Sequence, residues 1–294
     1  MEKKGFLESS IALFKSRKDI VFAVTWAAAL TTLIAGKGTP PLTESFLSII
    51  AVMTITLSVY IYNDTVDQEM DSYSEQEKKK SRPVANGLVS ETNAMRFVYL
   101  TGLMGLGLCL MISRLVFSIG FVYYSLFFLY SYPGVRFKEI YVVKNLVTSF
   151  LMPASFLISG AAVEHRLSLS ISFLAFTYYA LTVLVIPAIA DMLDYEEDKA
   201  FNVRTIGNTI SWKQNLILYN IGILVLIVGS AVSYLLFDFS YFVPILTSAI
   251  GITLMGYSYR LRNESGLTAS YKLRPVTYVL VLLNPLILAL GAVF

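Results

Sequence analysis

Nine long apolar segments recur along this chain of 294 residues, and each is long enough to cross a lipid bilayer as a helix. They lie at about 19–36, 44–63, 94–113, 115–132, 142–163, 168–190, 214–236, 241–259 and 275–293. A spanning helix needs roughly 17–25 mostly apolar residues, whereas the strands of a membrane barrel alternate apolar and polar residues. The segments lack that alternation. We therefore expect an all-α, polytopic membrane protein with nine transmembrane helices in a bundle.

The composition excludes several other classes of protein. Only 15% of the residues are charged, against about a quarter in soluble domains. The lone Cys109 and the lone His165 exclude a disulfide framework, a Cys- or His-based metal site and a His-centred triad. No basic, aromatic-rich stretch indicates a nucleic-acid partner, and no obligatory protein partner is evident. No linker divides the chain, so we expect residues 1–294 to form a single domain.

The distribution of positive charge predicts the orientation in the membrane. If the nine segments alternate across the bilayer, 20 of the 23 Lys and Arg residues lie on one side, and only Lys37, Arg114 and Arg166 on the other. Positive charge concentrates on the cytoplasmic side of membrane proteins. We therefore expect a cytoplasmic N-terminus, an outside C-terminus and long cytoplasmic loops. Size and the lack of a targeting segment favour the plasma membrane of a prokaryote.

Two acidic clusters stand at the predicted cytoplasmic ends of the second and sixth segments. The first contains Asn63, Asp64, Asp67 and Asp71, and the second contains Asp191, Asp194 and Asp198. On a helix with 100° per residue, each cluster falls on one face. Oxygen ligands suit Mg²⁺, which commonly takes one or two carboxylates and completes its shell with water and substrate phosphates. Two clusters therefore predict more than one Mg²⁺, with two as the expected number, bridging a polyphosphate.

Basic residues follow both clusters and the fourth apolar segment. The set comprises Arg82, Arg136, Lys138, Lys144, Lys199 and Arg204. Arg and Lys at these places can hold the diphosphate faces that metal leaves open. An apolar, aromatic-rich cavity beside them would suit an isoprenyl diphosphate. We expect Lys78, Lys79 and Lys80 to be solvated or to contact lipid headgroups instead.

The order of these motifs resembles the UbiA prenyltransferase family. The stretch Asn63-Asp64-x-x-Asp67-x-x-x-Asp71, with Arg82-Pro83 and Gly87-Leu88-Val89-Ser90 after it, is similar to the family's first signature. The stretch Asp191-x-x-Asp194-x-x-x-Asp198, with Arg204-Thr205 after it, is similar to the second, and Tyr132 to Lys138 resembles the tyrosine-lysine element between them. Two departures are the charged Ser72–Lys80 segment and Ala200-Phe201-Asn202, which replaces a common glycine.

The resemblance implies a role for each matching residue. The expected Mg²⁺ ligands are Asp64, Asp67, Asp71, Asp191, Asp194 and Asp198. The expected diphosphate-binding residues are Asn63, Arg82, Tyr132, Lys138, Lys144 and Arg204. The expected catalytic residues are Asp71, Asp198 and Lys138, with either aspartate as the general base. The implied reaction is Mg²⁺-dependent transfer of a prenyl chain to a lipophilic acceptor, an aromatic compound or a lipid precursor. The implied site is a central cavity, open to membrane lipid, under a cytoplasmic cap.

Three other functions fit parts of the pattern. A cation-coupled transporter also uses intramembrane acids, but these are expected near the bilayer midplane and on discontinuous helices. A phosphotransferase acting on nucleotide-activated alcohols would gather its acids in one Gly-containing motif. A non-catalytic homologue would have no need of the complete ligand set found here.

Overall fold

The computed structural model describes residues 5–73, 77–200 and 203–294 as helices joined by short connections, with no strand in those ranges. The α-helices are α1 (Phe6–Ser16), α2 (Lys18–Ala35), α3 (Leu42–Val66), α4 (Gln68–Tyr73), α5 (Glu77–Lys80), α6 (Glu91–Ile112), α7 (Arg114–Ser131), α8 (Val143–Ser149), α9 (Leu151–Glu164), α10 (Leu169–Ile186), α11 (Tyr195–Ala200), α12 (Ile206–Thr209), α13 (Trp212–Phe237), α14 (Phe242–Arg260) and α15 (Gly266–Val293). The short helices η1 (Phe137–Glu139), η2 (Pro187–Asp191) and η3 (Leu261–Asn263) lie between them.

The predicted helical membrane architecture is confirmed. Within the described part of the chain, nine helical segments have the length and apolar character needed to cross a membrane. The fifth segment is interrupted at Phe150, where α8 gives way to α9. The ninth helix begins at Gly266, nine residues before the predicted start. Lys272 and Arg274 hid that start, because charged residues are poor markers of a bilayer span.

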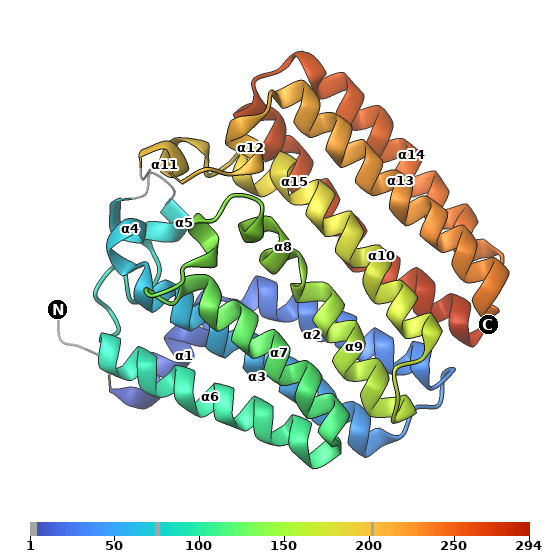
Figure 1. Ribbon diagram of the computed structural model, residues 1–294, viewed down its shortest axis with the longest axis horizontal. Coiled ribbons are helices and arrows are strands. Elements are labelled where there is room, and N and C mark those ends of the chain that lie inside the picture. Colours follow the sequence, from blue (N-terminus) through green and yellow to red (C-terminus); the bar gives the residue numbers. More distant parts are fainter. Residues whose placement is uncertain (1–4, 74–76, 201–202) are drawn as a thin grey trace.

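The long helices form a bundle in which segments distant in the sequence pack together (Figure 1). The helix pairs α3 with α6, α10 with α13, and α2 with α9 are in contact. The short helices α4, α5, α11 and α12 gather at one end of the bundle, here called the polar end (Figure 1). The first described helix, α1, lies toward that end and the C-terminus at the opposite one, which agrees with an odd number of spans.

Small residues allow α3 and α6 to approach closely. A Cβ at Gly105 would lie 2.6 Å from Ile55 Cγ1, and one at Gly102 would lie 2.9 Å from Ser58 Oγ. The Ser58 hydroxyl donates a hydrogen bond of 2.7 Å to the Val98 carbonyl across the same contact. Small side chains and interhelical hydrogen bonds are the usual means of holding helices together in lipid. The tight contact fixes α3, which carries the first acidic cluster at its end.

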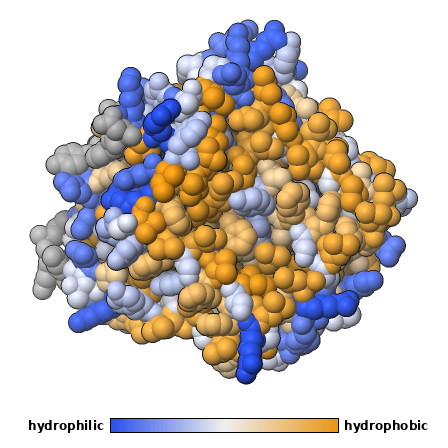
Figure 2. All heavy atoms as spheres, in the orientation of Figure 1, coloured by the Kyte–Doolittle hydropathy of each residue, from blue (hydrophilic) through white to orange (hydrophobic). Residues whose placement is uncertain are grey.

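The outer surface is apolar over the middle of the bundle (Figure 2). Large side chains such as Leu103, Phe176 and Leu236 are about 70% exposed, at 71%, 67% and 69%. A soluble protein rarely exposes extended apolar patches, whereas lipid tails solvate them. The bundle therefore has the surface of a protein embedded in a bilayer.

Candidate active site

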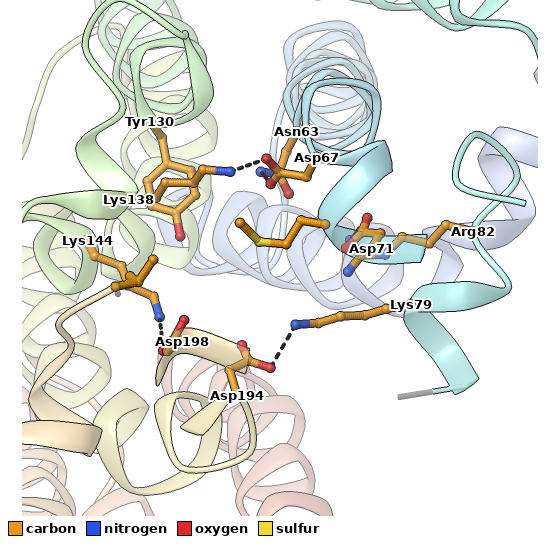
Figure 3. A pocket seen from close by; sticks show the side chains of 12 residues that line it. Asn63, Asp67, Asp71, Lys79, Arg82, Tyr130, Lys138, Lys144, Asp194 and Asp198 are labelled. Atoms are coloured by element: carbon orange, nitrogen blue, oxygen red, sulfur yellow. Dashed lines mark hydrogen bonds and ion pairs between the residues drawn. The ribbon is translucent and has the colours of Figure 1, made fainter. Parts of the chain in front are cut away.

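A cavity of about 150 Å³ at the polar end brings the two acidic clusters together (Figure 3). Its lining consists of Asn63, Asp67, Met70, Asp71, Lys79, Arg82, Tyr130, Lys138, Lys144, Asp194, Asp198 and Val203. Most of the lining side chains belong to the helices α3, α4, α5, α7, η1, α8 and α11. Others belong to the connection after α5 and to the connections on either side of α11. The site is therefore built from most of the chain and not from one local motif.

The first cluster spans a break between two helices. The α3 helix ends at Val66, Asp67 follows it as the capping residue, and α4 begins at the next position. The prediction of one uninterrupted helical face is wrong here, because the chain turns at Asp67. The turn directs Asp67 toward Lys138, with which it forms an ion pair, and Asn63 Nδ2 donates to Asp67 Oδ2 at 2.8 Å.

Arg82 connects the other two carboxylates of the first cluster. Its guanidinium pairs with Asp71 and lies 3.2 Å from Asp64 Oδ1. Asp64 is turned away from the cavity and also pairs with Arg17, whose Nε lies 2.7 Å from Asp64 Oδ2. Asp64 is 1% exposed and Asp71 is 2% exposed. Carboxylates this deeply buried need cationic partners, and the two arginines supply them.

The second cluster also departs from a regular helix. After α10, the chain passes at Pro187 into the π-helical turn η2, which ends at Asp191. Proline frees a backbone carbonyl within a helix, and π-turns often occur at functional sites. Asp194 lies between η2 and α11, and Asp198 lies within α11. A single helical face over Asp191–Asp198 is therefore also wrong, but Asp194 and Asp198 still line the same cavity.

Asp191 is fully buried behind the cavity wall. Its Oδ2 accepts hydrogen bonds from Asn145 Nδ2 at 3.0 Å and from the Gly207 amide at 3.4 Å. Lys144 Nζ lies 3.2 Å from Asp191 Oδ1 and 3.3 Å from Asp198 Oδ2. A single lysine on α8 thus holds two acids of the second cluster.

The cavity is lined by four acid–cation pairs. Figure 3 shows Asp67 with Lys138, Asp198 with Lys144 and Asp194 with Lys79, and Asp71 pairs with Arg82. Lys79 Nζ lies 3.0 Å from Asp194 Oδ1, and its side chain is only 15% exposed. The expectation that Lys79 is solvated or contacts lipid is wrong, because α5 folds back over the second cluster. The side chain of Lys78 lies outside the described residues.

Burial shifts the pKa values of two cavity carboxylates. It raises the pKa of Asp71, although Arg82 acts in the opposite direction. Burial raises the pKa of Asp198 to about 6, despite the attraction of Lys144, and the neighbouring Asp194 and Asp191 add to the rise. Carboxylates with raised pKa values are suited to accepting a proton near neutral pH.

Two predicted diphosphate ligands lie outside the cavity lining. Tyr132 caps α7, is 44% exposed and stacks on Phe128, with ring centroids 5.8 Å apart. Arg204 is exposed, with its guanidinium 5.6 Å from the ring centroid of Tyr141. The structure brings Asn63, Asp67, Asp71, Arg82, Lys138, Lys144, Asp194 and Asp198 together at the cavity, and places Asp64 and Asp191 behind it.

Several residues at the site were not predicted from the sequence, among them two basic residues and a tyrosine. Tyr130 lines the cavity in place of Tyr132, Lys79 pairs with Asp194, and Arg17 pairs with Asp64. The spacing of Tyr130 from Phe127, within the aromatic run of α7, is a signal for one shared helix face. No comparable local signal exists for Arg17, whose partner lies 47 residues away.

The donor set fits divalent magnesium. The cavity acids supply only oxygen ligands, which Mg²⁺ prefers. Among the described residues, no three acidic or His/Cys side chains form a ready-made metal cage. Mg²⁺ is usually held by few carboxylates together with substrate phosphates, so an open arrangement of acids and cations suits a metal that arrives with an anion.

Residues 21–281 of the chain match the model of the UbiA prenyltransferase family. Over 123 residues, the chain is 32% identical to 4-hydroxybenzoate octaprenyltransferase of Shewanella woodyi, a match that covers 42% of each protein. Over 230 residues, it is 29% identical to digeranylgeranylglyceryl phosphate synthase of Methanothermobacter thermautotrophicus, with 76% of each chain covered. The chain thus matches less than half the length of the first of these relatives.

Solved structures share the fold. A structure described as giving insight into digeranylgeranylglyceryl phosphate synthase in membranes superposes with a TM-score of 0.78 at 20% identity, covering 98% of this chain and 99% of the other. A UbiA homolog from Archaeoglobus fulgidus bound to GPP and Mg²⁺ superposes with a TM-score of 0.65 at 13% identity, covering 93% and 99%. At these identities the likeness concerns the fold alone.

Proposed function

The chain belongs to the UbiA prenyltransferase family, and we propose that it transfers an isoprenyl chain from a prenyl diphosphate to a lipophilic acceptor in an Mg²⁺-dependent reaction. The observation that carries the proposal is the single cavity at which carboxylates of both acidic clusters meet Lys79, Arg82, Lys138 and Lys144. A site built only to hold cations would not place four basic side chains among its acids. A site for a metal-bound diphosphate needs both kinds of group.

Four aspartates would hold the metal at the cavity surface: Asp67, Asp71, Asp194 and Asp198. Bound Mg²⁺, with two ions expected, supplies positive charge to the diphosphate oxygens and so makes the diphosphate a better leaving group. Asp64 and Asp191 would complete the predicted ligand set if they exchanged Arg17 and Asn145 for the metal.

The basic side chains would bind the diphosphate itself. Lys138 and Lys144 stand on one side of the cavity and Arg82 and Lys79 on the other (Figure 3). In a buried site, such preorganised cations stabilise the negative charge that develops on the diphosphate. Asn63 would donate to the diphosphate by exchanging one of its two present acceptors, Asp67 or the Ser131 hydroxyl, both at 2.8 Å. Tyr132 and Arg204 stay predicted ligands that would have to move inward.

The reaction then follows from the charge distribution. The allylic C–O bond breaks, and its electron pair leaves with the diphosphate, held by Lys138 and the other cations. An atom of the acceptor forms the new bond to the allylic carbon and loses its proton. Asp71 and Asp198 are candidates to accept that proton, because burial raises the pKa of each, and the base would be the one of the two that does not hold metal.

Aromatic side chains of α3 and α7 would shield the reactive allylic cation from water. Tyr130 lines the cavity, and its ring centroid lies 6.4 Å from that of Phe127. The Phe127 ring in turn lies 6.5 Å from Tyr60 and 5.2 Å from the buried Tyr123. Aromatic faces attract cations, and a dry cavity suppresses hydrolysis of a reactive intermediate.

The names of the relatives suggest two acceptor classes to test, a hydroxybenzoate and a glyceryl phosphate lipid. We place the polar end of the bundle in the cytoplasm of a prokaryote and the body in its plasma membrane, because the basic loops lie at that end. Cation-coupled transport is not supported: the acids lie at the polar end with basic partners, and the family is one of prenyltransferases.

The test measures Mg²⁺-dependent release of diphosphate from geranyl, farnesyl and geranylgeranyl diphosphates by the purified protein, with and without acceptors. We expect Asp67→Ala and Asp194→Ala each to abolish turnover, since each removes a carboxylate from a different cluster. The control is Glu69→Ala, which removes an exposed carboxylate of α4. A folded protein that neither binds nor turns over any of the three diphosphates in the presence of Mg²⁺ would contradict the proposal.

A further inference from the structure

A groove separate from the proposed diphosphate site lies between the start of α13 and the end of α14. It has a volume of about 400 Å³ and shares no lining residue with the diphosphate cavity. Its lining consists of Lys213, Leu216, Ile217, Asn220, Tyr259, Arg262 and Asn263. The two helices pack side by side along the outer edge of the bundle (Figure 1). Because α13 begins directly after α12, the groove lies near the polar end of the bundle.

Two basic side chains on opposite sides of the groove have no acidic partner. Lys213 belongs to the first turn of α13, and Arg262 belongs to η3. Among the residues that the structure describes, neither forms an ion pair, and Glu264, the acid nearest to Arg262 in the sequence, pairs with Lys272 at 2.6 Å. The groove therefore presents two uncompensated positive charges, whereas the cations of the diphosphate cavity are paired with acids.

Arg262 is held in place in a way that suits an anion. Its guanidinium carbon lies 4.0 Å from the ring centroid of Tyr259, within range of a cation–π interaction. Stacking on a ring face leaves the N–H groups at the edge of the planar guanidinium able to donate. The Trp212 indole Nε1 donates a hydrogen bond of 3.2 Å to the Leu261 carbonyl. Since these two residues directly precede Lys213 and Arg262, the bond fixes the two cationic sides of the groove against each other.

An amide donor lies deeper in the same groove. Asn220 stands two turns beyond Lys213 on α13, roughly 10 Å further from the polar end at 1.5 Å per residue. Its Oδ1 accepts a hydrogen bond of 2.8 Å from the Ser258 hydroxyl, whereas its Nδ2 donates to no described residue. An amide against lipid tails alone is costly, and an ester carbonyl would satisfy it.

The rest of the groove is apolar. Leu216 and Ile217 line it, and Tyr259 adds an aromatic ring at the level of the basic residues. Further along the two helices, Leu224 and Ile252 are exposed on the surface. Basic and aromatic side chains followed by an apolar surface are typical of the cytoplasmic interface of a membrane protein. The order from the polar end is cation, amide and apolar surface, which matches the phosphate, ester and chain of a phospholipid.

We propose that this groove binds an anionic phospholipid of the surrounding bilayer, with its phosphate between Lys213 and Arg262. The ester carbonyl of one chain accepts a hydrogen bond from Asn220, and that chain lies against Ile217. Basic pockets between spanning helices bind anionic headgroups by this chemistry. Because the lipid contacts α13 and η3 together, its binding stabilises their contact. The proposal is independent of the donor and acceptor of the prenyl transfer.

Native mass spectrometry of the detergent-purified protein measures bound lipid and oligomeric state together. The probes are phosphatidylglycerol and phosphatidylcholine with identical oleoyl chains. We expect the wild-type protein to bind phosphatidylglycerol about tenfold more tightly, and Lys213→Gln/Arg262→Gln to lose this preference, since each basic residue near an anionic lipid contributes about fivefold. Lys213→Arg/Arg262→Lys keeps both charges and should retain the preference. Asn220→Leu should weaken both lipids alike, because both carry the ester carbonyl.

The matched control is Lys15→Gln/Arg96→Gln, which removes the same two charges from exposed positions of α1 and α6. It should keep the wild-type preference. Phosphatidylglycerol should also raise the thermal stability of the wild-type protein and of this control, but not that of Lys213→Gln/Arg262→Gln. Inorganic phosphate should not raise it, because it has no chain to lie against Ile217.

Three results would overturn the proposal. The first is equal affinity of the wild-type protein for the two lipids, or an unchanged preference in Lys213→Gln/Arg262→Gln. The second is an effect of inorganic phosphate equal to that of phosphatidylglycerol, which would make the groove a site for free phosphate. The third is a wild-type dimer that Lys213→Gln/Arg262→Gln dissociates, which would make the groove a contact between two copies of this chain.

Discussion

Lys79 Nζ lies 3.0 Å from Asp194 Oδ1, so a side chain of α5 holds an acid of the second cluster across the cavity. The two residues are 115 positions apart in the sequence. Their pair joins the segment after the first cluster to the second cluster. Ion pairs between residues distant in the sequence therefore hold the short helices of the polar end together.

Replacing this lysine should weaken binding of the prenyl diphosphate. Lys79→Gln removes a cation from the cavity and leaves Asp194 without that partner, so we expect the Kd of a non-hydrolysable prenyl thiodiphosphate, with Mg²⁺, to rise about tenfold. The control is Lys80→Gln, which removes an exposed lysine next in the chain. Equal affinities of the two variants would show that Lys79 only covers the site.

The Arg17–Asp64 pair should contribute to stability. Arg17→Met leaves the buried Asp64 with Arg82 alone, and we expect the free energy of unfolding in detergent to fall by roughly 1–3 kcal/mol. Lys18→Met, at the exposed neighbouring position, should change it little. The double variant Arg17→Met/Asp64→Asn should recover part of the loss, because it no longer buries an under-compensated charge. Additive losses in the double variant would contradict this account.

Close packing of α12 against Asp191 gives another prediction. A Cβ at Gly207 would lie 2.4 Å from Asp191 Cβ and 2.8 Å from the Pro187 carbonyl oxygen. Gly207→Ala must therefore displace η2, and we expect a loss of roughly 1–3 kcal/mol in stability, the scale of core overpacking, with reduced turnover. Gly256→Ala is the matched control, because nothing lies within 4 Å of its added Cβ. A Gly207→Ala variant with normal turnover would show that Asp191 tolerates the shift.

Much of the fold was predictable because bilayer spans are recorded locally in the sequence. The run predicted at 241–259 corresponds to α14, Phe242–Arg260. The predicted start of the ninth segment came too late, because charged residues lie near the start of α15. The helix break at Asp67 was not predicted, because a count of 100° per residue assumes an unbroken helix. That break depends on tertiary contacts, which override local helical preference, whereas at Pro187–Asp191 the proline itself marks a departure from a regular helix.

The site was predictable to a smaller extent. The acidic motifs and Lys138 are local patterns, and four of the six aspartates meet Lys138 at the cavity. The partners Arg17 and Lys79 were not predictable, since nothing near either residue marks an acid 47 or 115 positions away. Likewise, the end of α7 decides which of two nearby tyrosines faces the cavity. Tyr130, in the last turn of α7, lines the cavity, and Tyr132, the residue that caps α7, lies outside it.

The four acid–cation pairs predict that Mg²⁺ and the prenyl diphosphate bind cooperatively. Mg²⁺ alone must compete with Lys138, Arg82, Lys79 and Lys144 for the acids, and the diphosphate alone must compete with the acids for these cations. When both bind, Mg²⁺ takes the acids and so releases the cations for the diphosphate. The diphosphate takes the cations and so releases the acids for Mg²⁺. Coupling between two ligands is reciprocal and commonly lies in the range of about 5–150-fold.

Titrations of a prenyl thiodiphosphate at zero and saturating Mg²⁺, and of Mg²⁺ with and without the thiodiphosphate, should therefore show the same affinity ratio, about tenfold or more. Chelation of Mg²⁺ should lower the thermal stability of the ternary complex far more than that of the protein alone. Because Lys138→Met leaves Asp67 without its cation, Mg²⁺ alone should bind this variant more tightly and the coupling should shrink. An affinity ratio near one in the wild-type protein would mean that the pairs stay closed when ligands bind, so that the acids act as structural anchors for the lysines and not as ligands of the metal.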